Sequence, residues 1–242
     1  MKKSVLVLLA LMFFVYGVNA QKKKVAVVTF YVNRYVEPDD NLSGNAKLIS
    51  SIAALSNNPN FNLSSILENF HNTFFNEFLP MFPFEVIDEK TIWENENYKQ
   101  MKSFDSTSIF QRNSLLYKDY RYCDVHSLFK SDLRRLIEYF PEYDGFMFVF
   151  LSYKIMAKAA IGGMGSAGIR AFVNMKLWNK ETKRVFTIYE GEYSKESVPL
   201  IAGIPVMDAE KILPMCQSAT DKVLVELKRR LPGMMKKVDK KL

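Results

Sequence analysis

The chain has 242 residues, of which 48% are hydrophobic and 14% aromatic, and 33 Lys and Arg against 26 Asp and Glu give a formal charge of +7. This composition excludes a disordered chain, a collagen and a small disulfide-stapled protein. Two cysteines and two histidines are too few for a multi-cysteine zinc site or a His-rich metal centre. We therefore expect a globular domain without a metal or another cofactor.

The first twenty residues have the features of a secretory signal peptide. Lys2 and Lys3 precede the apolar run 5–15, and Val18 and Ala20 supply the residues of a cleavage site. The apolar run is shorter than the roughly 20 residues of a membrane span, so an uncleaved anchor is only the alternative. Cleavage between Ala20 and Gln21 is predicted. The pattern favours export to a bacterial periplasm, with outer-membrane association or secretion as alternatives.

The mature part, residues 21–231, is predicted to form a single domain. A β-branched run at 24–31 indicates a buried strand, and a short helix is expected within 42–55. Apolar residues three and four positions apart predict a helix over 62–79, with Ser65 and Glu68 in a capping-box pattern.

Residues 84–87 are predicted to form a second strand, and 88–124 to form short helices and loops. The periodicity then predicts a helix over 128–140. Residues 146–155 begin almost wholly apolar, which is typical of a central strand.

Apolar and polar residues alternate in 169–177 and again in 184–195, with a polar turn between them. Period two predicts two strands joined as a β-hairpin near residues 169–196. Asp208 is expected to cap a final helix through about Leu231. The order of elements predicts an α/β (α+β) domain with a mixed sheet and flanking helices.

The basic surplus is concentrated at the C-terminal end. Without the first twenty residues the chain has 31 basic and 26 acidic residues, and residues 228–242 hold seven basic residues against one acid. The rest of the mature chain is therefore nearly neutral, whereas a nucleic-acid-binding domain needs a basic face. We expect no nucleic-acid partner, and we expect 232–242 to be a basic flexible tail or to contact anionic lipid weakly.

The segment Gly163–Gly168 spells G-x-G-x-x-G after a predicted strand. A dinucleotide site requires the third glycine to open a helix, but residues 169–177 alternate like a strand. The segment is therefore interpreted as a connector, or as a small-residue contact with a partner or a membrane surface. Together with the preceding Gly162, the glycines of this candidate surface are Gly163, Gly165 and Gly168.

Cys123 and Cys216 could pair as a disulfide in an oxidising compartment, or remain two buried free thiols. Cys123 and His126 have a C-x-x-H spacing, but a metal site needs more ligands and a nucleophile needs a positioned base. Since no hydrolase motif is present either, no catalytic residue is assigned. The balance leans away from an enzyme.

Three tyrosines, Tyr117, Tyr120 and Tyr122, follow one another closely in the sequence. Aromatic side chains with nearby arginines are common at binding surfaces, and they are also common in protein cores. Both interpretations remain open for this segment.

The order of elements resembles the α/β domain of the curli-secretion channel lipoprotein (CsgG-like) family and, more loosely, the amino-terminal domain of the TolB family. The residues that carry the resemblance are 25–30, the Asp144-Gly145 junction with 146–150, and 173–177 with Asn179 and Thr182 in the turn. Lys183 stands where that family has a turn glycine, and the family's lipidated cysteine is missing. The resemblance implies a periplasmic, non-catalytic domain that works through partners.

These observations predict an exported interaction or assembly protein of the bacterial cell envelope, with unidentified envelope proteins as partners. The first alternative is an exported hydrolase with an unrecognised site. The second is a periplasmic small-ligand or glycan-binding protein that uses the Tyr-rich stretch. A deep pocket with convergent carboxylates would favour the hydrolase, and a shallow aromatic groove would favour the binding protein.

Overall fold

A computed structural model describes residues 22–40, 42, 46–102, 108–124, 130–161, 164–236 and 238. Several positions singled out in the sequence lie outside these ranges. They are the cleavage site at Ala20 and Gln21, the metal-site candidate His126, and the glycines Gly162 and Gly163.

The described chain has an α/β fold with one mixed sheet, as predicted, and the sheet contains eight strands. The strands are β1 (Lys24–Pro38), β2 (Glu85–Val86), β3 (Ser114–Leu116), β4 (Gly145–Ile161), β5 (Met164–Asn179), β6 (Arg184–Tyr193), β7 (Val198–Ile201) and β8 (Ile204–Pro205). The strand order is β2-β1-β4-β5-β7-β8, with β3 paired to β1 and β6 paired to β5. β1 runs parallel to β2 and β4, and the other pairs are antiparallel.

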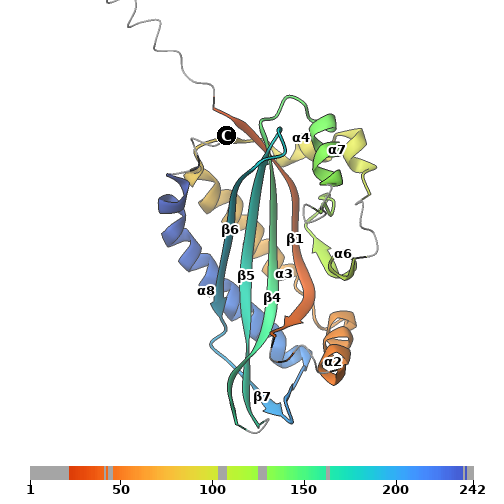
Figure 1. Cartoon of the computed structure of the whole chain (residues 1–242), viewed down its shortest axis with the longest axis vertical. Coiled ribbons are helices and arrows are strands. Elements are labelled where there is room, and N and C mark those ends of the chain that lie inside the picture. Colours follow the sequence, from red (N-terminus) through yellow and green to blue (C-terminus); the bar gives the residue numbers. More distant parts are fainter. Residues whose placement is uncertain are drawn as a thin grey trace, which may run out of the picture.

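Helices cover the two faces of the sheet unequally (Figure 1). They are α2 (Ala46–Asn57), α3 (Ser64–Thr73), α4 (Glu89–Trp93), α5 (Glu96–Lys99), α6 (Ile109–Asn113), α7 (Ser131–Tyr139) and α8 (Ala209–Met235). A π-helical turn (Phe74–Phe78) and a 3-10 turn (Leu79–Met81) continue α3. The first face packs against α2, α3 and α8, whereas α4, α5 and α7 cover the second face only at the end where β1 begins.

The core follows from the period of two along the strands. On β4, Met147, Val149 and Leu151 pack into the large cluster on the first face. Phe146 and Phe148 face the other way and pack against the smaller cluster of α4, α5 and α7. The beginning of β4 is therefore apolar on both faces, as the sequence indicated for a central strand.

The hairpin of β5 and β6 is confirmed, with Asn179 at its turn accepting hydrogen bonds from Glu181 and Lys183. The Asp208 cap is also confirmed, because its side chain accepts from the backbone N–H of Glu210.

Three local predictions are wrong. The capping box is not formed, since α3 begins after Leu63 rather than at Ser65, and no side chain caps it. β1 extends to Pro38, past the predicted end at Tyr31. Residues 232–235, assigned to a flexible tail, are the last turn of α8, where Met235 is buried against the core.

Candidate ligand-binding groove

The second face of the sheet changes character halfway along β4. Phe150, Ser152 and Lys154 continue the row of Phe146 and Phe148, but they follow the part of the face that α4, α5 and α7 cover. On β5 the same face carries Asn174 and Lys176. This part of the face is hollowed into a groove of about 520 Å³, which we call the open-face groove. Its lining residues are Tyr31, Asn33, Glu37, Ser108, Tyr122, Asp124, Phe150, Ser152, Lys154, Asn174, Lys176 and Tyr189.

Aromatic rings form the walls of the open-face groove. The rings of Tyr31 and Phe150 stack almost in parallel, with centroids 5.0 Å apart and an interplanar angle of 2°. Tyr122 lies against Tyr31 at 5.3 Å, and Tyr189 stacks on Phe172 at 4.7 Å. Since each ring is supported by another ring, the aromatic surface is held in a fixed orientation.

The polar side chains of the groove come from neighbouring strands and contact one another. Lys154 Nζ lies 3.3 Å from Glu37 Oε2, which joins β4 to the end of β1. Asn174 Nδ2 donates to Ser152 Oγ at 3.3 Å across the β4–β5 ladder. Carboxylate, ammonium, amide and hydroxyl groups thus lie between the aromatic walls, where each can also bond to a ligand.

Lys176 is the most perturbed cation of the groove. Burial lowers its pKa from 10.5 to about 8, Asp124 raises it, and Arg184 lowers it further. Its Nζ lies 5.4 Å from the centroid of the Phe150 ring. Near neutral pH the ammonium is therefore a donor placed among apolar rings, where a hydrogen bond to a ligand is worth more than in water.

Only one of the three tyrosines singled out in the sequence lines the groove. Tyr122 does so, whereas Tyr117 and Tyr120 are buried in the core on the first face, with exposures of 5% and 1%. Tyr31, Phe150 and Tyr189 also line the groove, from three different strands, and no sequence motif pointed to them. The sequence signal that could have predicted the groove is the alternation of side chains along β4 and β5. It places aromatic and polar residues, such as Phe150 and Asn174, on the same face of the sheet.

Cys123 and Cys216 are both buried and free. Cys123 packs in the smaller cluster on the second face, and Cys216 packs on α8 against the first face, so the sheet separates them. The possible disulfide is therefore not formed, and the two cysteines are the buried free thiols of the other interpretation. Burial raises the pKa of both thiols, which makes them poor nucleophiles.

Gly165 and Gly168 lie within β5, so the interpretation of this segment as a connector is wrong at these two positions, while Gly162 and Gly163 lie outside the described residues. Gly165 pairs with Leu200 of β7, and a side chain at Gly168 would collide with Lys158. Lys158 crosses Gly168 and donates to the backbone carbonyls of Ser194 and Glu196, at 3.1 and 2.8 Å. Gly168 therefore gives room for a lysine that ties the β4–β5 hairpin to the loop after β6.

A His–carboxylate pair lies in the interior. His71 Nε2 is 2.8 Å from Glu89 Oε1, and the imidazole packs between Tyr117 and Phe75, with ring centroids at 3.7 and 4.5 Å. The side chain is only 8% exposed. Rings cover the imidazole, so this pair is better suited to packing than to catalysis on a substrate. Within the described ranges, no group of three or more His, Cys, Asp and Glu is placed to hold a metal ion.

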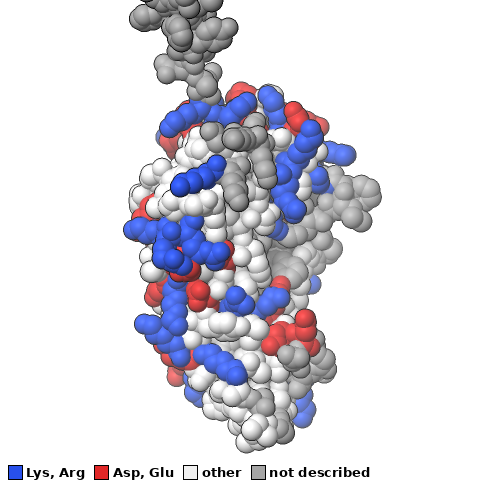
Figure 2. Space-filling view, turned by 60° about the vertical axis from the view of Figure 1, so that its left-hand side comes forward, with Lys and Arg blue, Asp and Glu red and all other residues white. Residues whose placement is uncertain are grey.

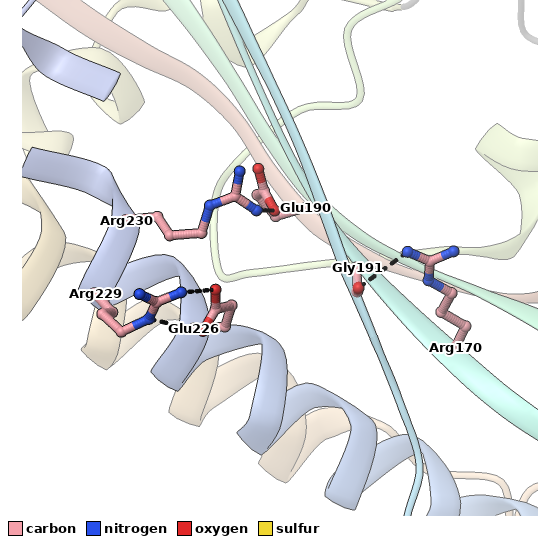
Figure 3. A network of polar contacts seen from close by, with 6 residues as sticks. All are labelled: Arg170, Glu190, Gly191, Glu226, Arg229 and Arg230. Carbon is pink, nitrogen blue, oxygen red and sulfur yellow. Dashed lines mark hydrogen bonds and ion pairs between the residues drawn. The ribbon is translucent and has the colours of Figure 1, made fainter. Parts of the chain in front are cut away.

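Part of the C-terminal basic surplus is engaged within the fold. Figure 3 shows Arg230 paired with Glu190 of β6 and Arg229 paired with Glu226 of α8. Lys228 lies 2.8 Å from Glu77. The Arg230 and Lys228 pairs attach the end of α8 to the sheet and to the π-helical turn, whereas the Arg229 pair lies within α8, so residues 228–230 belong to the domain.

The comparisons with known proteins give no assignment. No family model matches the chain, and a search of the curated proteins finds no match. In the part of the chain that the structure describes, no helix combines the length and apolar character needed to cross a membrane.

Proposed function

We propose that the chain is an exported, non-catalytic binding protein of the bacterial cell envelope that holds a saccharide in the open-face groove. The observation that carries this proposal is the shallow aromatic groove itself. Its volume of about 520 Å³ suits a small ligand. Tyr189, which is 52% exposed and stacks on Phe172, suits the C–H face of a sugar ring, and Asn174 and Lys176 suit its hydroxyl groups.

The charge balance of the groove favours an uncharged ligand. Lys154 is paired with Glu37, and Asp124 interacts favourably with the charged form of Lys176. A strongly charged ligand would have to displace one of these interactions. A polyhydroxylated ligand can instead accept and donate hydrogen bonds beside both signs of charge.

The hydrolase alternative has less support. Glu37 and Asp124 are the two carboxylates that line the groove, and Glu37 is already engaged by Lys154. The pair of His71 and Glu89 lies outside the groove, beneath aromatic rings. Neither arrangement provides the pair of convergent carboxylates that glycoside hydrolysis uses.

Calorimetric titration of the mature chain with a panel of neutral oligosaccharides tests the ligand. We expect binding that Tyr189→Ala weakens at least about fivefold, the loss of one stacked ring. Tyr193→Ala is the matched control, since Tyr193 is also an exposed tyrosine of β6 but does not line the groove. Equal losses in both variants, or binding of none of the sugars, would reject the saccharide groove.

The envelope part of the proposal is supported by the signal-peptide features and by the family resemblance. It is tested separately by fractionating cells that produce the full chain with a C-terminal tag. We expect the protein in the periplasmic fraction with Gln21 at its N-terminus. An intact chain in the cytoplasm would reject export without bearing on the groove.

A second candidate is the assembly function expected from the sequence. It is favoured by β6, a ten-residue strand that pairs with β5 alone in the described sheet. An edge strand can accept an added strand from a partner protein. Hydrogen exchange in an envelope extract tests this candidate, because an added strand would slow exchange at the β6 amides, and unchanged exchange would reject it.

A further inference from the structure

The aromatic wall of the open-face groove continues beyond the groove to an arginine. Phe172 stacks on the groove residue Tyr189, with ring centroids 4.7 Å apart. The guanidinium Cζ of Arg170 lies 4.8 Å from the centroid of the Phe172 ring and 4.9 Å from that of Tyr193. The Tyr193 hydroxyl in turn donates to Met156 Sδ at 3.4 Å. Contacts with two supported rings therefore hold the guanidinium in a fixed orientation.

Arg170 lies on the same face of the sheet as the groove. It precedes the groove residue Asn174 by four positions on β5, so the strand places it about 13 Å farther along this face. In the register it lies opposite Lys154 of β4, which also lines the groove. A ligand with one sugar unit in the groove can therefore bring a second unit to Arg170.

The charge of Arg170 has no ion-pair partner among the residues that the structure describes. The cation opposite it, Lys154, already pairs with Glu37 at 3.3 Å, so this carboxylate is engaged by the other cation. Two like charges in register on neighbouring strands repel each other and lower the stability of the fold. An anion bound beside Arg170 would offset this repulsion.

The acidic residues of β6 near Arg170 belong to the opposite face of the sheet. Glu190 pairs with Arg230 of α8, as Figure 3 shows. Glu192 lies opposite Ala171, which packs in the large cluster on the first face. Figure 2 shows blue and red side chains next to one another over much of the visible surface, which is the usual compensation of charge. Arg170 differs from these residues because the described part of the fold supplies no carboxylate to it.

The guanidinium of Arg170 retains hydrogen-bond donors for a ligand. Only one of its five N–H groups is used by the Gly191 carbonyl, to which Nη2 donates at 3.2 Å. Nε is buried without a partner, whereas Nη1 is accessible and bonds to no described residue. Figure 3 shows the second terminal nitrogen pointing away from Gly191. Nη1 and the remaining N–H of Nη2 can therefore bind the two oxygens of one carboxylate.

We propose that the ligand of the open-face groove is an acidic saccharide, with a neutral unit in the groove and the carboxylate of a uronic acid unit on Arg170. This inference rests on the proposed function, because it extends a saccharide that starts in the groove. The neutral unit fits the balanced charges of the groove, and the acidic unit fits the unbalanced charge beside it.

Calorimetric titration of the mature chain with matched disaccharides that differ only in one carboxylate, cellobiose and cellobiouronic acid first, tests this proposal. We expect the acid to bind about tenfold more tightly than its neutral partner, the effect of one charge-assisted contact. In Arg170→Gln the ratio of the two affinities should fall to about one. Arg170→Lys should retain part of the ratio, because lysine keeps the charge and loses the planar pair of donors.

Arg229→Gln is the matched control, since it removes the same charge from an exposed arginine of α8 on the other face. It should keep the ratio of the wild type. Thermal unfolding of each variant establishes that it is folded under the conditions of the titration.

The outcomes separate this inference from the proposed function. A neutral sugar that binds the wild type as tightly as its acid would overturn the acidic unit and leave the saccharide groove in place. Equal loss of both sugars in Arg170→Gln would assign Arg170 to the support of the Phe172 ring and would also overturn it. Binding of the acid that Arg170→Gln abolishes and Tyr189→Ala leaves unchanged would reject the groove and retain the carboxylate site. Failure of every sugar, neutral or acidic, would reject both.

Discussion

Substitution of Lys176 measures how much a polar side chain of the open-face groove lowers the free energy of unfolding. The substitution Lys176→Met keeps the length of the side chain and removes its charge. Burial lowers the pKa of Lys176 from 10.5 to about 8, against the opposing effect of Asp124. A lysine pKa that is lower in the folded than in the unfolded state means that the charged form destabilises the fold.

The magnitude follows from the shift. Lowering a pKa from 10.5 to about 8 corresponds to about 3 kcal/mol at full effect. Lys176 is partly exposed, so solvent screens much of this, and we expect roughly 1 kcal/mol. The penalty is fully present below about pH 8, where Lys176 is charged in both states. It falls as the pH rises towards 10.5, because only the folded protein has then released the proton.

Urea unfolding followed by circular dichroism, between about pH 7 and about pH 9.5, measures this effect. The wild type should gain roughly 1 kcal/mol of stability over this range relative to Lys176→Met, and the variant should be the more stable protein at about pH 7. The tyrosines with raised pKa, such as Tyr31 and Tyr153, affect both proteins alike. Lys180→Met, at an exposed lysine in the β5–β6 turn, is the control. Parallel pH profiles for wild type and Lys176→Met would refute the reasoning.

Three further predictions concern the packing around the groove and the core. Tyr153→Phe removes the buried hydrogen bond between Tyr153 Oη and Thr220 Oγ1, which is 3.0 Å long, and should lower the free energy of unfolding by about 1 kcal/mol in urea, since Thr220 keeps its bond to the Cys216 carbonyl. A loss of more than about 3 kcal/mol would mean that this hydroxyl does more than the single bond. Gly191→Ala places a methyl group against the ring of Phe172, which stacks on Tyr189, and should destabilise the protein by about 1–3 kcal/mol in thermal unfolding. An unchanged melting temperature would show that the ring moves without cost. Cys123 and Cys216 should both be unreactive to Ellman's reagent in the native protein and react fully in denaturant, because both thiols are buried. Rapid reaction of either native thiol would contradict the burial.

The elements that the sequence predicted well are those whose pattern is local. Apolar and polar residues alternate over much of β5 and β6, which are joined by a turn in which Asn179 bonds to its own neighbours. Asp208 caps α8 through a contact two residues away. Such features depend on nearby residues alone, so the sequence contains the information needed to predict them.

The second half of β1 was missed because its pattern is interrupted. Between Val32 and Val36 the pairing with β4 shifts register, and Asn33 accepts a hydrogen bond from the backbone of Tyr35. A bulge breaks the alternation on which strand prediction rests. The missed segment includes Asn33 and Glu37, which line the groove.

The groove itself depends on tertiary packing. Tyr117 and Tyr122 are five positions apart, yet Tyr117 packs against His71 on one side of the sheet and Tyr122 against Tyr31 on the other. The residue type alone does not predict which tyrosine packs on which side of the sheet, because burial stabilises either ring. The lining side chains come from strands that the topology, and not the chain order, brings together.

The second face of the sheet presents a physical contrast that bears on function. Where α4, α5 and α7 cover it, the face carries Phe146 and Phe148 on β4, whereas Lys176 lies opposite Phe148 on β5 and Asn174 and Ser152 lie further along the same face. If those positions served stability alone, a further helix over apolar residues would bury more surface. A half-buried lysine with a lowered pKa reduces stability at neutral pH instead. Side chains that lower stability at one place in a well-packed domain are best explained by a ligand that contacts them. For this reason we assign the proposed function to the groove and not to the core pair of His71 and Glu89.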